Sequence, residues 1–102
     1  MGRYIIKLND RFFVWSTVVD APVTYGLTTD ELREFICIEY GRRGLDNLAA
    51  QLERVEAKGH SGHEDFTLAE LLAGNRAGEN EMTLTPDEIY QRFAVAPEYG
   101  SD

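Results

Sequence analysis

The sequence predicts an α+β fold in which an N-terminal antiparallel β-hairpin packs against three to four short α-helices, with room for a third short strand. Three observations predict it. The first 19 residues are rich in β-branched and aromatic residues. Several later segments open with helix-capping patterns and continue with apolar residues three and four apart. Strands precede helices along the chain, which favours a small sheet with helices on one face.

The hairpin is predicted to consist of strands at residues 3–8 and 12–19, joined by a turn at residues 9–11. Asn and Asp favour such a turn because they tolerate left-handed backbone. Both faces of the hairpin are apolar at one end. Either other parts of the chain cover both faces there, or the hairpins of two protein molecules pair in a dimer. Pro22 is excluded from a central strand, and residues 23–25 and 82–84 are the candidates for a third strand.

Three of the four predicted helices begin at a capping pattern. Thr28 and Glu31 form a capping-box pattern before a helix that Gly41 ends, and a basic loop at residues 42–44 precedes a second helix at residues 45–58. Thr67 with Glu70 opens a short helix that ends at Gly74.

The last predicted helix begins at Thr85-Pro86 and runs to about Ala94. We expect one α+β domain over residues 1–95 and a C-terminal tail over residues 96–102.

Composition fits one compact domain, because the chain has 102 residues of which 43% are hydrophobic. Its net charge is -8. Residues 1–45 carry six basic and six acidic side chains, whereas residues 46–102 carry four basic and twelve acidic ones. This excess argues against direct nucleic-acid binding and would attract a basic protein partner. The alternative is that the acidity only keeps the protein soluble.

An acidic protein-binding surface is the leading site hypothesis. Its candidate members are the acidic side chains of the C-terminal part, with one aromatic anchor from the hairpin: Glu53, Glu56, Glu64, Asp65, Glu70, Glu79, Glu81 and Trp15. The aromatic residues of the chain are otherwise expected in the core, and exposure of Trp15 would discriminate the two interpretations.

A basic focus at Arg33, Arg42 and Arg43 is the candidate anion-binding site. The alternative is that these arginines form internal ion pairs with Glu34 or Glu39.

Metal and nucleophilic chemistry have weaker signals. His60 and His63, beside Glu64 and Asp65, are the best metal candidates, but the spacing fixes no third ligand and Ser61-Gly62 makes the loop flexible. Cys37 lies beside the apolar Ile36 and is expected to pack in the core. No glycine-rich phosphate loop or catalytic motif is present, so we expect no cofactor and no enzyme activity.

The expected location is the cytoplasm. There is one cysteine, the N-terminus lacks a signal-peptide pattern, and no apolar run is long enough to span a membrane.

Two stretches carry a resemblance. Residues 15–26, followed by the capped helix to Tyr40, and the loop at residues 75–78 are similar to small uncharacterised proteins of actinobacteria and their phages. The similarity covers roughly the first half of the chain. It implies an accessory protein that a phage could encode, and it transfers no functional residues.

The sequence therefore leads to three functional hypotheses. The first is a non-enzymatic, acidic accessory protein that binds and inhibits a host nucleic-acid-handling or defence protein. The second is a small metal-dependent or acid–base enzyme that uses the His60 and His63 loop. The third is a structural homodimer formed through the aromatic hairpin.

Overall fold

The computed structural model describes residues 3–94 and confirms the α+β class. Its sheet has the strand order β1 (Arg3–Leu8), β2 (Arg11–Ser16) and β3 (Ala21–Pro22), and all pairings are antiparallel. The helices are α1 (Thr29–Lys58), α2 (Leu68–Ala73) and α3 (Pro86–Phe93), with a 3-10 turn η1 (Glu79–Glu81) before α3. The predicted tail at residues 96–102 lies outside the described residues.

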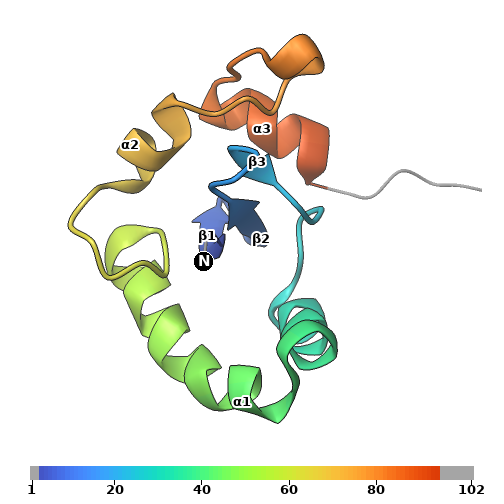
Figure 1. Cartoon of the computed structure of the whole chain (residues 1–102), viewed down its shortest axis with the longest axis vertical. Helices are drawn as coiled ribbons and strands as arrows, with labels where there is room; N and C mark the ends of the chain where they lie inside the picture. Colours follow the sequence, from blue (N-terminus) through green and yellow to red (C-terminus); the bar gives the residue numbers. More distant parts are fainter. Residues whose placement is uncertain (1–2, 95–102) are drawn as a thin grey trace, which may run out of the picture.

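Helices cover both faces of the sheet, so the expectation of helices on one face is wrong. The sheet lies in the centre of Figure 1, with α1 on one side and α2 and α3 on the other. Alternation along the strands explains the arrangement. Ile5 and Val14 point into a core with α1, whereas Ile6, Phe13 and Trp15 point into a second core with α2 and α3.

The first strand matches its prediction, whereas the second ends at Ser16 and not at residue 19. Residues 17–20 form a turn instead. Ser16 Oγ accepts a hydrogen bond from the Val18 amide at 3.2 Å, and Asp20 adopts a left-handed φ of 54°. This turn leaves the Val18 side chain 75% exposed, so turn chemistry overrides the β-propensity of the two valines.

The third strand was predicted at residues 23–25 or 82–84. It lies instead at β3, directly before the first of these segments, and residues 82–84 form no strand. The pairing continues irregularly beyond it. The Val23 amide donates to Val14 O at 2.8 Å, and Leu27 and Phe12 exchange two backbone hydrogen bonds. Pro22 therefore sits on an edge strand, where its missing N–H costs no ladder bond.

The opposite edge, β1, is covered by the segment that follows α1. The Lys7 amide donates to Gly59 O, and the Ser61 amide donates to Ile5 O at 2.9 Å. Ser61 Oγ also accepts from the Ile5 amide at 2.8 Å. This segment protects an edge that would otherwise present unpaired backbone groups.

The two predicted helices are joined across a kink into the 30-residue α1, so residues 3–94 contain three α-helices, of which one is long. The backbone of Gly41 is non-helical (φ 69°, ψ -159°), so the helix is interrupted at the predicted position, but residues 42–44 are helical rather than a loop. Glycine adopts this φ at little cost. We refer to residues 29–40 and 42–58 as the first and second limbs of α1; they turn at the bottom of Figure 1.

The two predicted capping boxes, at Thr28 and Thr67, are confirmed, and the predicted Thr85 cap also forms a capping box. Thr28 with Glu31, Thr67 with Glu70, and Thr85 with Glu88 each exchange a side-chain and a backbone hydrogen bond at a helix start. Among the described residues, no helix is long and apolar enough to cross a membrane.

Candidate functional site

The acidic side chains of the C-terminal part lie on the surface. All ten acidic residues between positions 46 and 94 are exposed: Asp46, Glu53, Glu56, Glu64, Asp65, Glu70, Glu79, Glu81, Asp87 and Glu88. Two of the basic residues there, Arg54 and Lys58, are half-buried and donate to backbone carbonyls. The fold therefore exposes the carboxylates to solvent. Two of the positive charges that could offset them are instead used in hydrogen bonds to the chain's own backbone.

Four of the seven predicted acidic site residues also have structural partners. Glu56 pairs with Lys7 at 3.7 Å, and Glu64 accepts from the Tyr4 hydroxyl at 3.3 Å. Glu70 accepts from the Thr67 amide in a capping box, and Glu81 pairs with Arg76 at 3.0 Å. The side chains without a partner among residues 3–94 are those of Glu53, Asp65 and Glu79.

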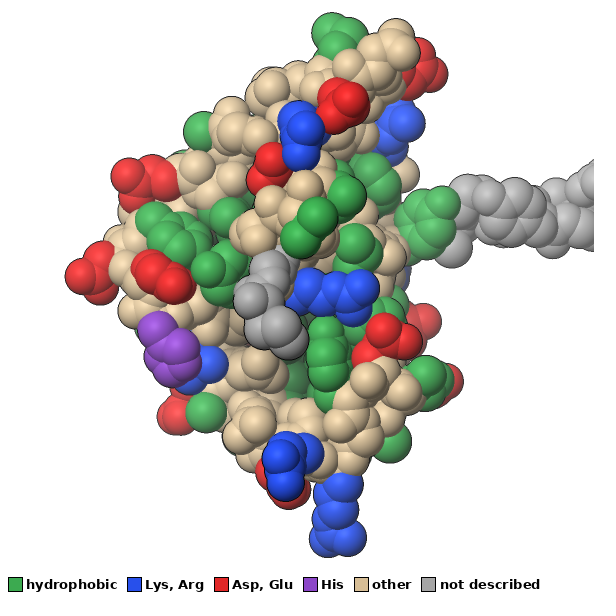
Figure 2. All heavy atoms as spheres, viewed as in Figure 1, with side chains coloured by type: hydrophobic (Ala, Val, Ile, Leu, Met, Phe, Trp, Pro, Cys, Tyr) green, Lys and Arg blue, Asp and Glu red, His purple; other side chains and the backbone are tan. Residues whose placement is uncertain are grey.

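These seven residues are not brought together at one place. Those between positions 53 and 70 lie on the second limb of α1, the loop after it and α2, whereas Glu79 and Glu81 lie on η1. Figure 1 shows η1 and the second limb at opposite ends of the molecule. On the face shown in Figure 2, acidic side chains form separate groups interspersed with basic ones.

Trp15 is a core residue, so its candidate role as an exposed protein-binding anchor is wrong. Its side chain is 1% exposed and packs between the sheet and the α2 and α3 layer. Phe12 and Phe13 are buried as well, whereas Tyr25 and Tyr40 are partly exposed. Because helices of the same chain cover both faces of the hairpin, its large aromatic residues are not available to a second copy.

His60 and His63 do not converge. His60 is fully buried and stacks on Phe66, with ring centroids 4.1 Å apart. Its Nε2–H donates to Phe66 O at 2.7 Å, and its Nδ1 accepts from the Gly62 amide at 3.0 Å. Both ring nitrogens thus serve the loop backbone, while His63 is exposed. Residues 3–94 contain no group of three or more metal-ligating side chains.

Cys37 is exposed, which corrects the expectation that it packs in the core. Its neighbour Ile36 is buried. Adjacent residues on a helix are turned by about 100° from each other, so the side chain after a core position can face solvent.

The three arginines of the candidate anion-binding site, Arg33, Arg42 and Arg43, are exposed and form no ion pair with another described residue. The alternative of a pair with Glu39 is not realised, because Glu39 lies 3.5 Å from Arg3 instead. Of the three arginines, Arg43 lines a pocket.

This pocket, which we call the kink pocket, has a volume of about 290 Å³ and lies between the hairpin and the inner side of α1 at its bend. Its floor is apolar and consists of Ile5, Val14 and Ile36. Gly44 allows the bend to be tight, since a Cβ there would lie 2.6 Å from Tyr40 Cβ.

Polar side chains line the walls of the kink pocket. Arg43, Asn47 and Gln51 come from the second limb of α1, and Arg3 and Tyr40 come from β1 and the end of the first limb. Arg3 Nη1 donates to the Tyr40 hydroxyl at 3.4 Å, and this bond first, then Glu39, raises the pKa of Arg3. Sequence reasoning found Arg43 but missed the other residues of the pocket, because Arg3 is 40 positions from Arg43 along the chain and no local pattern links them.

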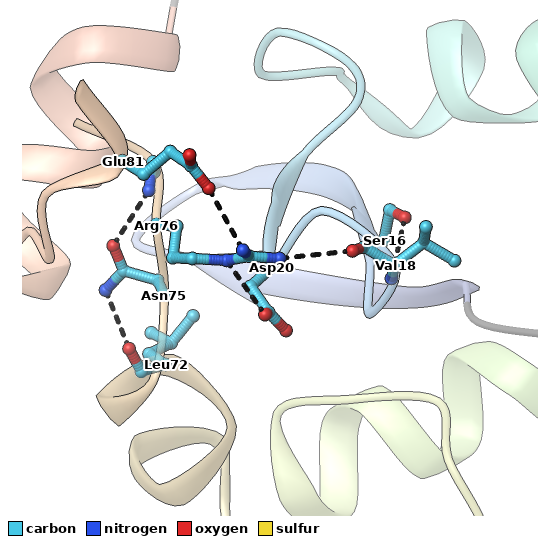
Figure 3. Close-up of polar contacts among 8 residues, drawn as sticks. Ser16, Val18, Asp20, Leu72, Asn75, Arg76 and Glu81 are labelled. Carbon is cyan, nitrogen blue, oxygen red and sulfur yellow. Dashed lines mark hydrogen bonds and ion pairs between the residues drawn. The ribbon is translucent and has the colours of Figure 1, made fainter. Parts of the chain in front are cut away.

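A second polar cluster is structural. Arg76 pairs with Asp20 at 3.2 Å and with Glu81 at 3.0 Å, and it donates to Val18 O, so it ties the turn after β2 to the loop after α2 (Figure 3). The neighbouring Asn75 is fully buried, and its side-chain amide makes four hydrogen bonds to the backbone of Leu72 in α2, of Ala77 and of Leu84.

Comparison of this chain with protein-family models, curated proteins and solved structures finds no significant match. The interpretation of its surfaces therefore rests on the residues themselves.

Proposed function

We propose that this protein is a small acidic binding protein that acts by associating with a basic region of another protein, without catalysis of its own. The observation that carries the proposal is the outward display of all ten acidic residues between positions 46 and 94. Such a surface attracts a basic partner and speeds its encounter, an effect that salt weakens.

The part of this surface best suited to a partner includes the second limb of α1 and the loop after it. Glu53 and Glu56 are three residues apart and so share one face of the helix. Glu64 and Asp65 follow in the loop that Lys58 attaches to the end of the helix through the carbonyls of Gly62 and Glu64. This attachment fixes the loop that carries both carboxylates against the end of α1 before a partner arrives.

The partner class follows from this charge. A protein that handles nucleic acid presents a basic surface to phosphates, and exposed carboxylates can occupy such a surface in their place. The resemblance to actinobacterial and phage proteins extends the proposal to an inhibitor of a host nucleic-acid-handling or defence protein. Its site of action would then be the cytoplasm.

The test is affinity capture from an actinobacterial lysate at low and at high salt, with the captured proteins identified by mass spectrometry. We expect a specific basic partner at low salt that is lost at high salt. The variant Glu53→Gln/Asp65→Asn removes two carboxylates that have no partner in the described chain and should capture less of it.

The matched control is Asp30→Asn/Glu34→Gln, which removes the same charge from exposed positions on the first limb. It should capture the partner as the unaltered protein does. Equal loss in both double variants would show an effect of net charge alone, and absence of a specific partner at either salt would contradict the proposal.

A further inference from the structure

We propose that the kink pocket is a ligand-binding site for a carboxylate that carries an amide and a small apolar side chain. The C-terminal residue of a peptide and an N-acylated apolar amino acid share this chemistry. The site is separate from the acidic surface discussed above, and it needs no acidic side chain to bind its ligand.

The α1 wall of the pocket presents three side chains that no other described residue engages. Arg43, Asn47 and Gln51 are spaced four residues apart and therefore form one line along the second limb. The line begins with a guanidinium and continues with two amides. A guanidinium can donate two parallel hydrogen bonds to one carboxylate, and an amide side chain can donate to and accept from a peptide group.

The opposite wall adds a second cation. Arg3 lines the pocket together with Tyr40, and the two are already linked at 3.4 Å. Glu39 is the acidic group that faces Arg3, at 3.5 Å, and both side chains are 43% exposed. A solvent-exposed pair of this kind contributes little stability, so a ligand carboxylate can replace Glu39 as the partner of Arg3.

The floor and the size of the pocket restrict what can accompany the carboxylate. Ile5, Val14 and Ile36 are aliphatic and almost fully buried, which suits a side chain such as leucine. The volume of about 290 Å³ is at the small end of ligand sites. It accommodates about one residue with its peptide group, while phosphate alone would leave the floor uncovered.

The test is a titration of the full chain with N-acetyl-L-leucine, followed by ¹⁵N–¹H NMR spectroscopy. We expect saturable shifts at the amides of Ile5, Val14 and residues 40–51. N-acetyl-L-leucinamide has the same acetyl group and side chain but an uncharged amide in place of the carboxylate. It should bind at least about tenfold more weakly, because it loses hydrogen bonds to a charged group. Acetate and inorganic phosphate carry negative charge but lack the amide and the leucine side chain, so they should also bind more weakly than N-acetyl-L-leucine.

A pair of protein variants locates the site. Arg43→Gln should weaken binding of N-acetyl-L-leucine about tenfold. Arg42→Gln removes the same charge one position away, at a side chain that does not line the pocket, and should leave binding unchanged. Each variant is shown to be folded if its amide chemical shifts outside the pocket match those of the unaltered protein.

Two further outcomes identify the source of the ligand. If N-acetyl-Ala-Ala-Leu binds at least as tightly as N-acetyl-L-leucine, the site takes peptide C-termini. If only the shorter compound binds, it takes acylated amino acids. Equal binding of acid and amide, equal binding of inorganic phosphate, or equal weakening by Arg42→Gln and Arg43→Gln would each overturn the proposal.

Discussion

Replacing His60 by alanine separates a structural role of this residue from metal binding. The ring is fully buried, donates to Phe66 O at 2.7 Å, accepts from the Gly62 amide at 3.0 Å, and stacks on Phe66. His60 also belongs to the segment that pairs with the edge of β1 at Ile6. Its loss should therefore affect both the loop and the sheet.

The magnitude follows from these contacts. Each buried backbone group left without a partner costs about 1–3 kcal/mol, and loss of the ring stacking adds about 0.5–1.5 kcal/mol. The hydrogen bond to Phe66 O is only part-buried, so the cost should lie in the lower half of the range that these values give. We expect His60→Ala to lower the free energy of unfolding by about 3–5 kcal/mol, a large part of the roughly 5–15 kcal/mol typical of a domain. The matched control His63→Ala, at an exposed position, should change it by less than about 0.5 kcal/mol.

The assay is urea denaturation followed by tryptophan fluorescence, because Trp15 is buried and is the single tryptophan. It is repeated with and without added zinc. The metal hypothesis predicts stabilisation by zinc that both histidine variants lose. A loss below about 1 kcal/mol for His60→Ala, or such a zinc dependence, would refute the structural reasoning.

Three further predictions concern the fold. Asn75→Ala should cost about 2–4 kcal/mol of unfolding free energy by urea denaturation, because it removes an amide with four buried or half-buried hydrogen bonds. Gly44→Ala should lower the melting temperature because of the 2.6 Å approach to the first limb, whereas Gly74→Ala, with nothing within 4 Å, should not. The hydrogen bond from Tyr90 at 2.7 Å is the main cause that lowers the pKa of Asp10. Tyr90→Phe should therefore reduce stability by an amount that is fully present above about pH 4, the ordinary pKa of aspartate, and is lost as pH falls further through the lowered pKa of Asp10 in the folded protein; a difference that persists in strong acid would contradict this.

Local signals in the sequence predicted much of the fold. The capping boxes at Thr28 and Thr67 and the cap at Thr85 depend on residues close together in the chain, so they could be predicted from the sequence. The first strand followed from residue type and length. The break at Gly41 and the helix beyond it were also predicted, but residues 42–44 were expected to form a loop, because a local pattern does not show where the second helix begins.

Features that depend on distant contacts could not be predicted. His60 stands among polar residues and glycines, and it is buried only because its segment pairs with β1. The sequence does not show whether Trp15 faces a partner or the core. It is buried because α2 and α3 of the same chain pack over it. The kink pocket needs Arg3 opposite Arg43, and no local pattern joins positions 40 residues apart.

The central claim is that exposed carboxylates of the second limb and its loop bind a basic partner. The measurement that tests it most directly is the affinity for the captured partner as a function of salt concentration, for the unaltered protein, for Glu53→Gln/Asp65→Asn and for the control Asp30→Asn/Glu34→Gln. The account predicts affinity that falls with salt, and a shallower fall for the first variant alone. Affinity that does not change with salt, or the same dependence in all three proteins, would contradict it.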